Sequence, residues 1–486
     1  MSPPEDAQAA AILPASPRRL TLPTVGAAAF PIGLAIVFVL LFVALMLSQG
    51  GASAVTEVIF GLRQGATYAL IAVGYTMVYG IIELINFAHG DVFTLSAFYA
   101  ITLVYWSGQL HLPIASLATE HGLPGLVAAL LILTPVTMVA AGLTGMAIER
   151  LAYRRMRNSP RIAALITAIG MSFLLEGIMF AVFVPGGGSV GAPYPDRMNG
   201  WIAPVTTTVT GFTGKSLHVA GTPGSTVYTY EVVPYKNVFG DARPSERASI
   251  QNGPESLSAT NHISISLPSA PQNADGLGIV RVAGGNSQGL IARVPAGTTD
   301  YQDAGAPATP YTPSTTEPGV VTNIGGVRIT WDEVFVIAAA VALMIVLQLF
   351  INRSRLGKAM RASAQDRDAA RICGINLNRT IAATFFIGSA LAAAAAIVYV
   401  TTDINGTIQW NLGYQIGIIA FTAAVLGGIG NIVGAGVGGF IIGLVASFAA
   451  TLLGGQWSDP IIFAILILIL TLRPTGLLGL RVPDRA

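Results

Sequence analysis

The chain has 486 residues, of which 53% are hydrophobic and only 10% are charged, and its mean hydropathy is +0.65. Soluble globular chains usually carry about 25% charged residues, so this composition indicates an integral membrane protein. The net charge of +2 gives no support for nucleic-acid binding. A single cysteine, Cys373, excludes an intrachain disulfide and a cysteine-built zinc site, and the five scattered histidines lack metal-ligand spacing, so we expect no metal and no cofactor.

The N-terminal 26 residues are polar and rich in Pro and Ala, and we interpret them as a tail. The apolar run that follows is too long for the apolar region of a signal peptide, so it predicts a retained span. A spanning helix needs roughly 20 apolar residues. By this criterion the sequence predicts an all-α polytopic protein with about ten transmembrane helices, at 27–49, 55–82, 87–107, 123–149, 161–184, 333–351, 380–401, 411–430, 434–455 and 459–473.

Lys and Arg concentrate in the short cytoplasmic loops of membrane proteins. Here they cluster before the first span, at 153–161 and 352–379, and in "LRPTGLLGLRVPDR" (472–485). With ten spans and a cytoplasmic N-terminus, all of these clusters fall on the cytoplasmic side. We therefore expect cytoplasmic tails at 1–26 and 474–486, a first membrane half at 27–184, a second at 333–473, and multi-pass insertion in a bacterial inner membrane.

The same topology places residues 185–332 outside, and their composition is rich in Ser, Thr, Gly and Pro. Stretches at 225–233, 262–267, 278–284 and 326–331 alternate apolar and polar residues, which is typical of half-buried strands. We expect an inserted extracytoplasmic segment that is β-rich or partly disordered. The Pro-rich stretch 303–319 is typical of disorder. "GFTGKS" (211–216) lacks the glycine spacing of a phosphate-binding loop.

The stretch "ELINFAHGDVF" carries polar side chains between two apolar runs, in the order Glu83, Asn86, His89 and Asp91. Asn86 is a natural helix N-cap, and the glycine at position 90 permits unusual backbone angles. Two interpretations stay open. The stretch is either a plain turn at the cytoplasmic surface or a broken helix beside a route through the bilayer.

The loop "GKAMRASAQDRDAARICGI" (357–375) is bracketed by Gly357 and Gly374 and consists of good helix formers. It predicts a short amphipathic helix that ends near Gly374. The pattern alone favours a solvated loop. Its length and its small residues favour instead a surface helix that docks into a partner's groove.

Four motifs occur in order along the chain: "NFAHGDVFTLSAF", "LITAIGMSFLLE" (165–176), the 357–375 loop, and "AVLGGIGNIVGAGVGGFIIGL" (424–444). Together they resemble the membrane permease subunit of ABC importers for branched-chain amino acids, over about 55–185 and 333–480. The resemblance implies a non-enzymatic subunit that pairs with a homologous permease, two cytoplasmic ATPases and a periplasmic solute-binding protein. It also implies a coupling helix inserted into the ATPase, formed or bracketed here by Gly357, Arg361, Asp366, Ala370 and Gly374.

The family usually has only a short external loop where this chain has 185–332, so the docking of a binding protein stays open. A buried acid in a span costs about 3 kcal/mol and normally faces a cavity or a partner. Glu176 either lies close enough to the outer surface to be hydrated or faces such a cavity. In the second case we expect it to line the solute path, with Arg63 as a possible partner. Asn86, His89 and Gly90 complete the predicted path. The spacing of Gly430, Gly434 and Gly438 predicts close helix packing.

These features predict an importer of branched-chain or related amino acids. Import of another small polar solute, such as urea or an amide, is the alternative within the family. A transporter driven by an ion gradient is a second class, but few acids lie within the spans. A membrane-anchored extracytoplasmic binding module is a third, and ten spans exceed what anchoring requires.

Overall fold

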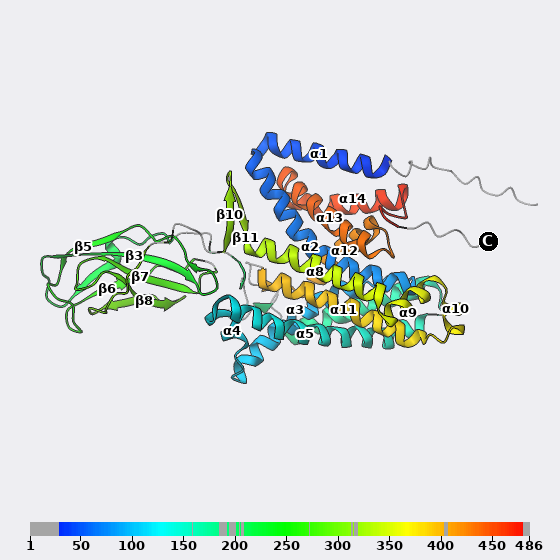
Figure 1. Ribbon diagram of the computed structural model, residues 1–486, viewed down its shortest axis with the longest axis horizontal. Helices are drawn as coiled ribbons and strands as arrows, with labels where there is room; N and C mark the ends of the chain where they lie inside the picture. Colours follow the sequence, from blue (N-terminus) through cyan, green and yellow to red (C-terminus); the bar gives the residue numbers. More distant parts are fainter. Residues whose placement is uncertain are drawn as a thin grey trace, which may run out of the picture.

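The computed structural model describes residues 29–157, 159–183, 192–193, 201–203, 205, 209–271, 273–312, 314, 319–402 and 407–479. It consists of a helical bundle with a β-sandwich at one end (Figure 1). The predicted tail 1–26 lies outside the described residues, as does the tail 474–486 beyond residue 479.

A helix lies over each of the ten predicted spans. Their bounds are α1 (Ala29–Gln49), α2 (Gly51–Ile82), α3 (Ala88–Gln109), α5 (Gly122–Ile148), α7 (Arg161–Phe183), α8 (Trp331–Arg353), α11 (Leu377–Thr402), α12 (Leu412–Gly427), α13 (Ile432–Leu453) and α14 (Ser458–Leu472). Within the described residues, eight helices are long and apolar enough to cross a membrane, and α12 is a shorter apolar helix. This confirms the polytopic helical class.

Short helices connect the long ones. At the end of the bundle nearer the sandwich they are α4 (Ile114–Glu120) and the 3-10 turn η4 (Gly455–Trp457). At the opposite end they are the π-helical turn η2 (Glu149–Tyr153), α6 (Arg154–Met156), α9 (Arg355–Gln365) and α10 (Arg367–Ile372). The helix of the 357–375 loop is therefore divided, because Asp366 adopts an extended backbone between α9 and α10.

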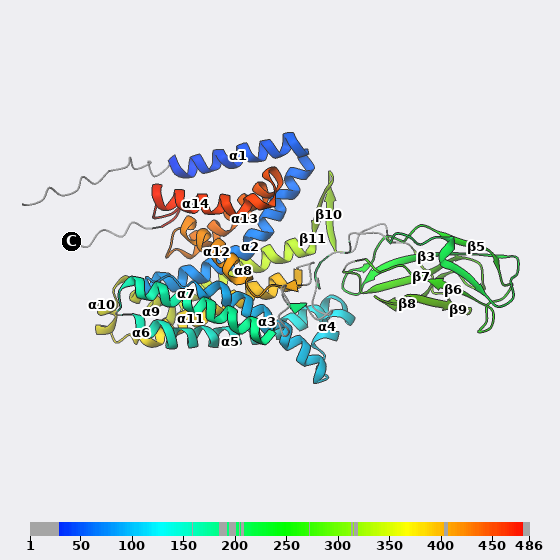
Figure 2. The same ribbon diagram turned by 180° about the vertical axis from the view of Figure 1, so that it is seen from behind.

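Helix α2 is the centre of the bundle and packs against α13, α11, α12 and α8. Its contact with α13 depends on glycine, since a Cβ on Gly65 would lie 2.7 Å from the Cα of Phe440. In Figure 2 helix α7 faces the viewer and α5 lies along the lower edge of the bundle. Large apolar side chains are exposed on the peripheral helices, as expected for surfaces that face lipid, including Leu40, Leu47, Leu131, Ile166, Val346 and Ile467.

The inserted segment folds into two packed antiparallel sheets. One sheet has the order β2 (Leu217–Ala220), β6 (His262–Ser266), β9 (Asp300–Asp303). The other has the order β4 (Gly240–Asp241), β3 (Thr226–Lys236), β7 (Gly276–Ala283), β8 (Gly289–Pro295), and β5 (Ala248–Gly253) also pairs with β3. Their shared core includes Tyr228, Tyr230, Val232, Ile263, Ile265, Leu277 and Ile279. Strands β3, β6 and β7 confirm three of the four predicted strands, and the fourth, at 326–331, corresponds to a strand outside the sandwich, β11 (Val327–Thr330).

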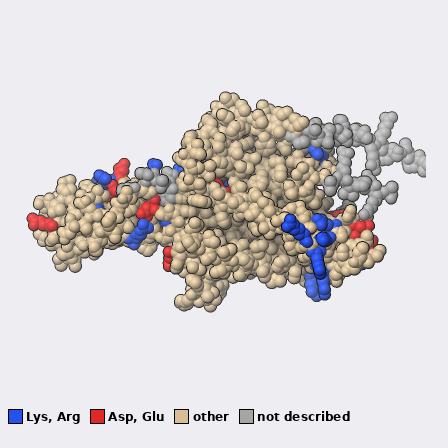
Figure 3. Space-filling view, viewed as in Figure 1, with Lys and Arg blue, Asp and Glu red and all other residues tan. Residues whose placement is uncertain are grey.

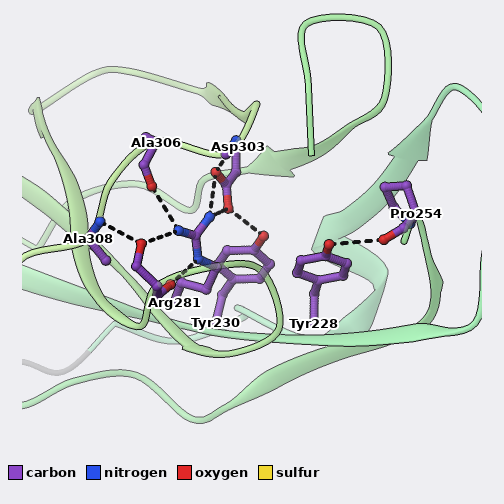
Figure 4. Close-up of polar contacts among 9 residues, drawn as sticks. Tyr228, Tyr230, Pro254, Arg281, Asp303, Ala306 and Ala308 are labelled. Atoms are coloured by element: carbon purple, nitrogen blue, oxygen red, sulfur yellow. Dashed lines mark hydrogen bonds and ion pairs between the residues drawn. The ribbon is translucent and has the colours of Figure 1, made fainter. Parts of the chain in front are cut away.

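The prediction of disorder at 303–319 is wrong for its described first part, 303–312. The buried Arg281 guanidinium donates to the carbonyl of Ala306 at 2.8 Å, and Leu290 pairs with Thr309 in an isolated bridge. Arg281 also forms a buried ion pair with Asp303 at 2.7 Å, and the Tyr230 hydroxyl donates to the same carboxylate at 2.8 Å (Figure 4). This polar cluster attaches the Pro-rich stretch to the sandwich.

Two short pairings join the sandwich region to the bundle. The hairpin β10 (Val320–Ile324) and β11 (Val327–Thr330) leads into α8, and β1 (Ala192–Pro193) pairs with β12 (Thr407–Ile408). Basic side chains gather at the opposite end, over α9 (Figure 3). Exposed residues there include Arg353, Arg355, Lys358 and Arg361.

Candidate functional site

The segment 83–87 re-enters the bundle between α2 and α3. Helix α2 ends because Glu83 adopts a left-handed backbone, with φ 54°, and its N–H bonds the carbonyl of Tyr79 at 2.8 Å. The chain then runs back alongside α2 and brings the His89 ring against Gly74. A Cβ built on Gly74 would lie only 2.5 Å from His89 Nε2. Gly74 precedes the end of α2 by two turns, which is about 12 Å along the helix. The chain thus turns at the exposed Glu83 and returns alongside α2, and the stretch is buried inside the bundle from Asn86 onward apart from the half-buried Phe87.

The sequence predicts Asn86 as the N-cap of α3, and this prediction is wrong. The N-cap residue is Phe87, and the Asn86 side chain instead accepts a hydrogen bond from the Tyr153 hydroxyl at 2.9 Å. Asn86 is 4% exposed, and Tyr153 belongs to η2 at the end of α5. The amide of Asn86 therefore holds the re-entrant segment against a third helix.

His89 lies within an aromatic cluster formed by Tyr75, Phe87, His89 and Phe421. The Tyr75 and His89 rings are 4.7 Å apart edge to face, and Phe421 lies 6.2 Å from Tyr75 and 6.0 Å from Phe87. His89 is 1% exposed, and its Nε2 has no hydrogen-bond partner among the described residues. The cluster fills the space between α2, α3 and α12.

Gly90 has ordinary helical backbone and contributes close packing, not unusual dihedral angles. A Cβ at this position would lie 2.1 Å from the carbonyl oxygen of Gly413 and 2.6 Å from the Cα of Gly417. The absence of side chains at these glycines lets α3 and α12 cross in contact. Any larger residue at Gly90 would force the two helices apart.

Asp91 is a buried acid that the predicted path did not include. Its side chain accepts a hydrogen bond from the Ser172 hydroxyl of α7, and its Oδ1 has no partner among the described residues. Glu176, one turn beyond Ser172 on α7, is 7% exposed. An acid in the first turn of an otherwise apolar helix was the available sequence signal.

Arg63 does not pair with Glu176. Its guanidinium forms an ion pair with Asp332 of α8 at 3.1 Å and donates to the carbonyl of Thr402 at 3.0 Å. Asp332 lies in the first turn of α8, where a carboxylate also interacts favourably with the helix dipole.

A cavity of about 480 Å³ opens in the half of the bundle nearer the sandwich. None of the four predicted path residues lines it. It lies between α2, α8, α11, α12, α13 and α14, and its lining includes Phe60, Arg63, Gln64, Thr67, Tyr68, Val336, Thr402, Gln415, Ile416, Ile419, Ser447, Asp459 and Ile462.

The predicted coupling residues lie on two sides of α9 and α10. Gly357 and Ala370 are buried against the bundle, whereas Arg361 is exposed and donates to the Asn352 side chain at 2.9 Å. Asp366 caps α10 by accepting from the backbone N–H groups of residues 368 and 369 at 2.9 and 3.1 Å. Gly374 has a left-handed φ of 79° after the end of α10.

Helix α10 contacts the central helix directly, because Arg367 donates to the carbonyl of Ile81 at 2.9 Å. The outer surface of the two short helices is exposed and mixed in character, and Ile372 is 88% exposed. We call this outer surface, consisting of Lys358, Arg361, Ala364, Asp368, Ala369, Arg371 and Ile372, the loop face.

The glycine series of α13 divides into two kinds of site. A Cβ on Gly434 would lie 2.4 Å from the carbonyl oxygen of Gly427, and one on Gly438 would lie 2.1 Å from that of Ala423. Gly430 instead precedes α13 with a left-handed φ of 91° and open space around it. Its expected packing role is therefore wrong, and its turn conformation explains the glycine.

The chain matches the family model described as "Branched-chain amino acid transport system / permease component" over residues 58–214 and 305–470. It is 32% identical over 426 residues to the high-affinity branched-chain amino acid transport system permease protein BraD of Pseudomonas aeruginosa, covering 87% of this chain and 95% of that protein. It is 30% identical over 419 residues to LivH of Escherichia coli K12, a protein of the same description, covering 86% and 93%. No solved structure gives a significant match.

Proposed function

Because this chain belongs to the family of branched-chain amino acid transport permease components, we propose that it is the transmembrane subunit of an ATP-driven importer of branched-chain or related amino acids. It would lie in a bacterial inner membrane with both termini in the cytoplasm. The basic end over α9 supports this orientation, since positive charge is retained on the cytoplasmic side. The sandwich would then be extracytoplasmic.

The observation that carries this proposal is the contact of α10, one of the two helices that present the loop face, with the central helix α2. Two cytoplasmic ATPases would bind the loop face and hydrolyse ATP, and a homologous second permease would complete the membrane pair. Movement of α9 and α10 would reach α2 through the Arg367 bond to Ile81. Alternating access then follows as a rigid-body shift of α2 against its neighbours.

The inner part of the solute path would pass Asn86, His89, Gly90 and Glu176. In the described conformation the aromatic cluster closes the space between α2, α3 and α12, so it would act as the inner gate. A periplasmic solute-binding protein would approach from the side of the sandwich. Residues 215–304, which fall between the two matched segments, would therefore alter or extend its docking surface.

The test is uptake of radiolabelled leucine by proteoliposomes that contain the complete transporter with its binding protein. Charge reversal at Arg361 and Asp366 should abolish uptake and leave basal ATP hydrolysis intact. Unchanged, coupled uptake in these variants would refute the coupling role. His89→Ala and Asn86→Ala should lower uptake at equal expression, and wild-type uptake in both would refute the path.

A further inference from the structure

The cavity near the sandwich has the size and character of a site for a small ligand. Ligand sites in proteins occupy about 300–1,000 Å³ and combine an apolar lining with a few convergent polar groups. This cavity measures about 480 Å³, and its polar and apolar groups come from six different helices. It lies farther from the loop face than the aromatic cluster does, because Tyr68 and Ile419 precede Tyr75 and Phe421 on helices that run toward that end.

Two opposite charges face this cavity without neutralising each other. Arg63 is held by Asp332 and the Thr402 carbonyl, which together use two of its five N–H donors. Asp459, from the first turn of α14, accepts from the Gln415 amide at 2.9 Å. Each charged group is therefore fixed in place by a neighbour and keeps hydrogen-bonding capacity.

The remaining lining contains both polar and apolar side chains. The polar ones include Gln64, Thr67, Tyr68 and Gln415. The apolar part consists of Phe60, Val336, Ile416, Ile419 and Ile462. Such a lining favours a small solute that carries both charged groups and an aliphatic group.

We infer that this cavity is the outward-facing solute site and that it binds a zwitterionic α-amino acid with an aliphatic side chain. Arg63 binds the carboxylate, Asp459 binds the ammonium group, and the aliphatic group packs on Ile416 and Ile419. Arg63 keeps its ion pair with Asp332 and uses its remaining donors for the solute carboxylate, while the ammonium group supplies a positive charge beside Asp459. The inference rests on the proposed function and adds the site and the role of each charge.

The first test measures leucine uptake in the complete proteoliposome system for Asp459→Asn and Arg63→Gln. Asp459→Asn keeps an acceptor for Gln415 and removes only the charge. We expect uptake to fall about tenfold or more for each variant, the loss expected when one charge-assisted bond is removed. Stimulation of ATP hydrolysis by the leucine-loaded binding protein should persist, and Asp459→Glu should restore part of the uptake. The matched controls, Glu120→Gln on α4 and Arg150→Gln on η2, change exposed residues outside the cavity and should transport normally.

Wild-type uptake in both cavity variants would overturn the inference and leave the proposed function standing. A wild-type complex that hydrolyses ATP and imports no amino acid would overturn both. Stimulated ATP hydrolysis in the variants also shows that they are folded, so a loss of uptake is not a loss of protein.

A second test uses thiol labelling of the cavity and does not depend on charge variants. In a Cys373→Ser background, Thr67→Cys places a thiol in the cavity lining, and Thr422→Cys places one in the packed interior of α12. A membrane-impermeant reagent added from outside should modify the first and not the second. L-leucine should slow the modification and L-arabinose should not. No reaction at Thr67→Cys, or protection by L-arabinose alone, would overturn the inference.

Discussion

The guanidinium of Arg367 donates a 2.9 Å hydrogen bond to the carbonyl of Ile81, in the last turn of α2. The last four carbonyls of a helix have no partner within it, and a cation there also interacts favourably with the helix dipole. Arg367 therefore caps the central helix from a segment 286 residues later in the chain. Since α2 also carries Arg63 and Tyr75, one rigid helix connects the loop face with the cavity and the aromatic cluster.

We predict that Arg367→Ala separates ATP hydrolysis from uptake. The substitution removes the bond to α2 and leaves α10 capped by Asp366. Leucine uptake should fall about tenfold, which corresponds to about 1.4 kcal/mol of lost coupling. ATP hydrolysis by the assembled complex should be retained. The control is Arg379→Ala, because Arg379 is exposed at the start of α11 and lies outside the loop face. Equal effects of the two variants would contradict the prediction.

The lengths of the apolar runs predicted the helices well, because a segment in lipid must satisfy its backbone hydrogen bonds within itself, as a helix does. The alternation of apolar and polar residues predicted strands β3, β6, β7 and β11, because successive side chains of a strand point to opposite faces of the sheet. The site is different, because its contacts join distant segments. Nothing near Arg63 indicates Asp332, and nothing near Asp91 indicates Ser172. The separate roles of Gly430 and Gly434 also depend on where α13 begins, which four-residue spacing alone does not determine.

A second prediction concerns the crossing of α3 and α12. Gly90→Ala would place a Cβ 2.1 Å from the Gly413 oxygen, so the helices must separate, at a cost of about 1–3 kcal/mol. The thermal midpoint of the purified protein should fall. Gly170→Ala is the matched control, because it lies within α7 with nothing within 4 Å of the added Cβ. A helix interior gains about 1 kcal/mol from this change, so the control should be neutral or stabilising. A lower midpoint for the control alone would contradict the assignment.

A third prediction concerns the buried cluster of the sandwich in Figure 4. Asp303→Asn removes the only charge described next to the Arg281 guanidinium, which is 1% exposed in its side chain. Breaking a buried ion pair from one side costs about 3–5 kcal/mol. Arg293→Met breaks the more exposed pair with Asp241, and its contact with the Tyr235 ring, at about 1 kcal/mol.

Limited proteolysis of the full-length protein should distinguish these two variants. Cleavage within 209–312 should be much faster for Asp303→Asn and nearly unchanged for Arg293→Met. The Asp303→Asn substitution should also release the Pro-rich stretch, because it disturbs the Arg281 guanidinium, which donates to the Ala306 carbonyl. Equal protection of both variants would show that the cluster does not stabilise the sandwich.

The last prediction concerns the pH dependence of the sandwich and arises from Lys236. Its amine is buried and donates to the carbonyl of Asn273 at 2.9 Å, and burial lowers its pKa from 10.5 to about 8, although Asp275 opposes the shift. Between these two pKa values the unfolded chain binds more protons than the folded chain, so stability rises with pH. From pH 7 to pH 9.5 the gain is about 2 kcal/mol.

Proteolysis rates within 209–312, normalised to an unfolded substrate at each pH, should therefore fall between pH 7 and pH 9.5. Lys236→Met keeps the apolar stem and removes the amine, so its rates should be low at pH 7 and independent of pH. The pH must stay below 10, because burial raises the pKa of Tyr235 and Tyr230 above their usual value of 10, and their ionisation would then destabilise the fold. Burial also raises the pKa of Asp275, but this pKa starts from 3.8, on the acid side of the range from pH 7 to pH 9.5. A wild-type protein whose protection falls between pH 7 and pH 9.5 would show that the Lys236 amine is stabilised in its charged form.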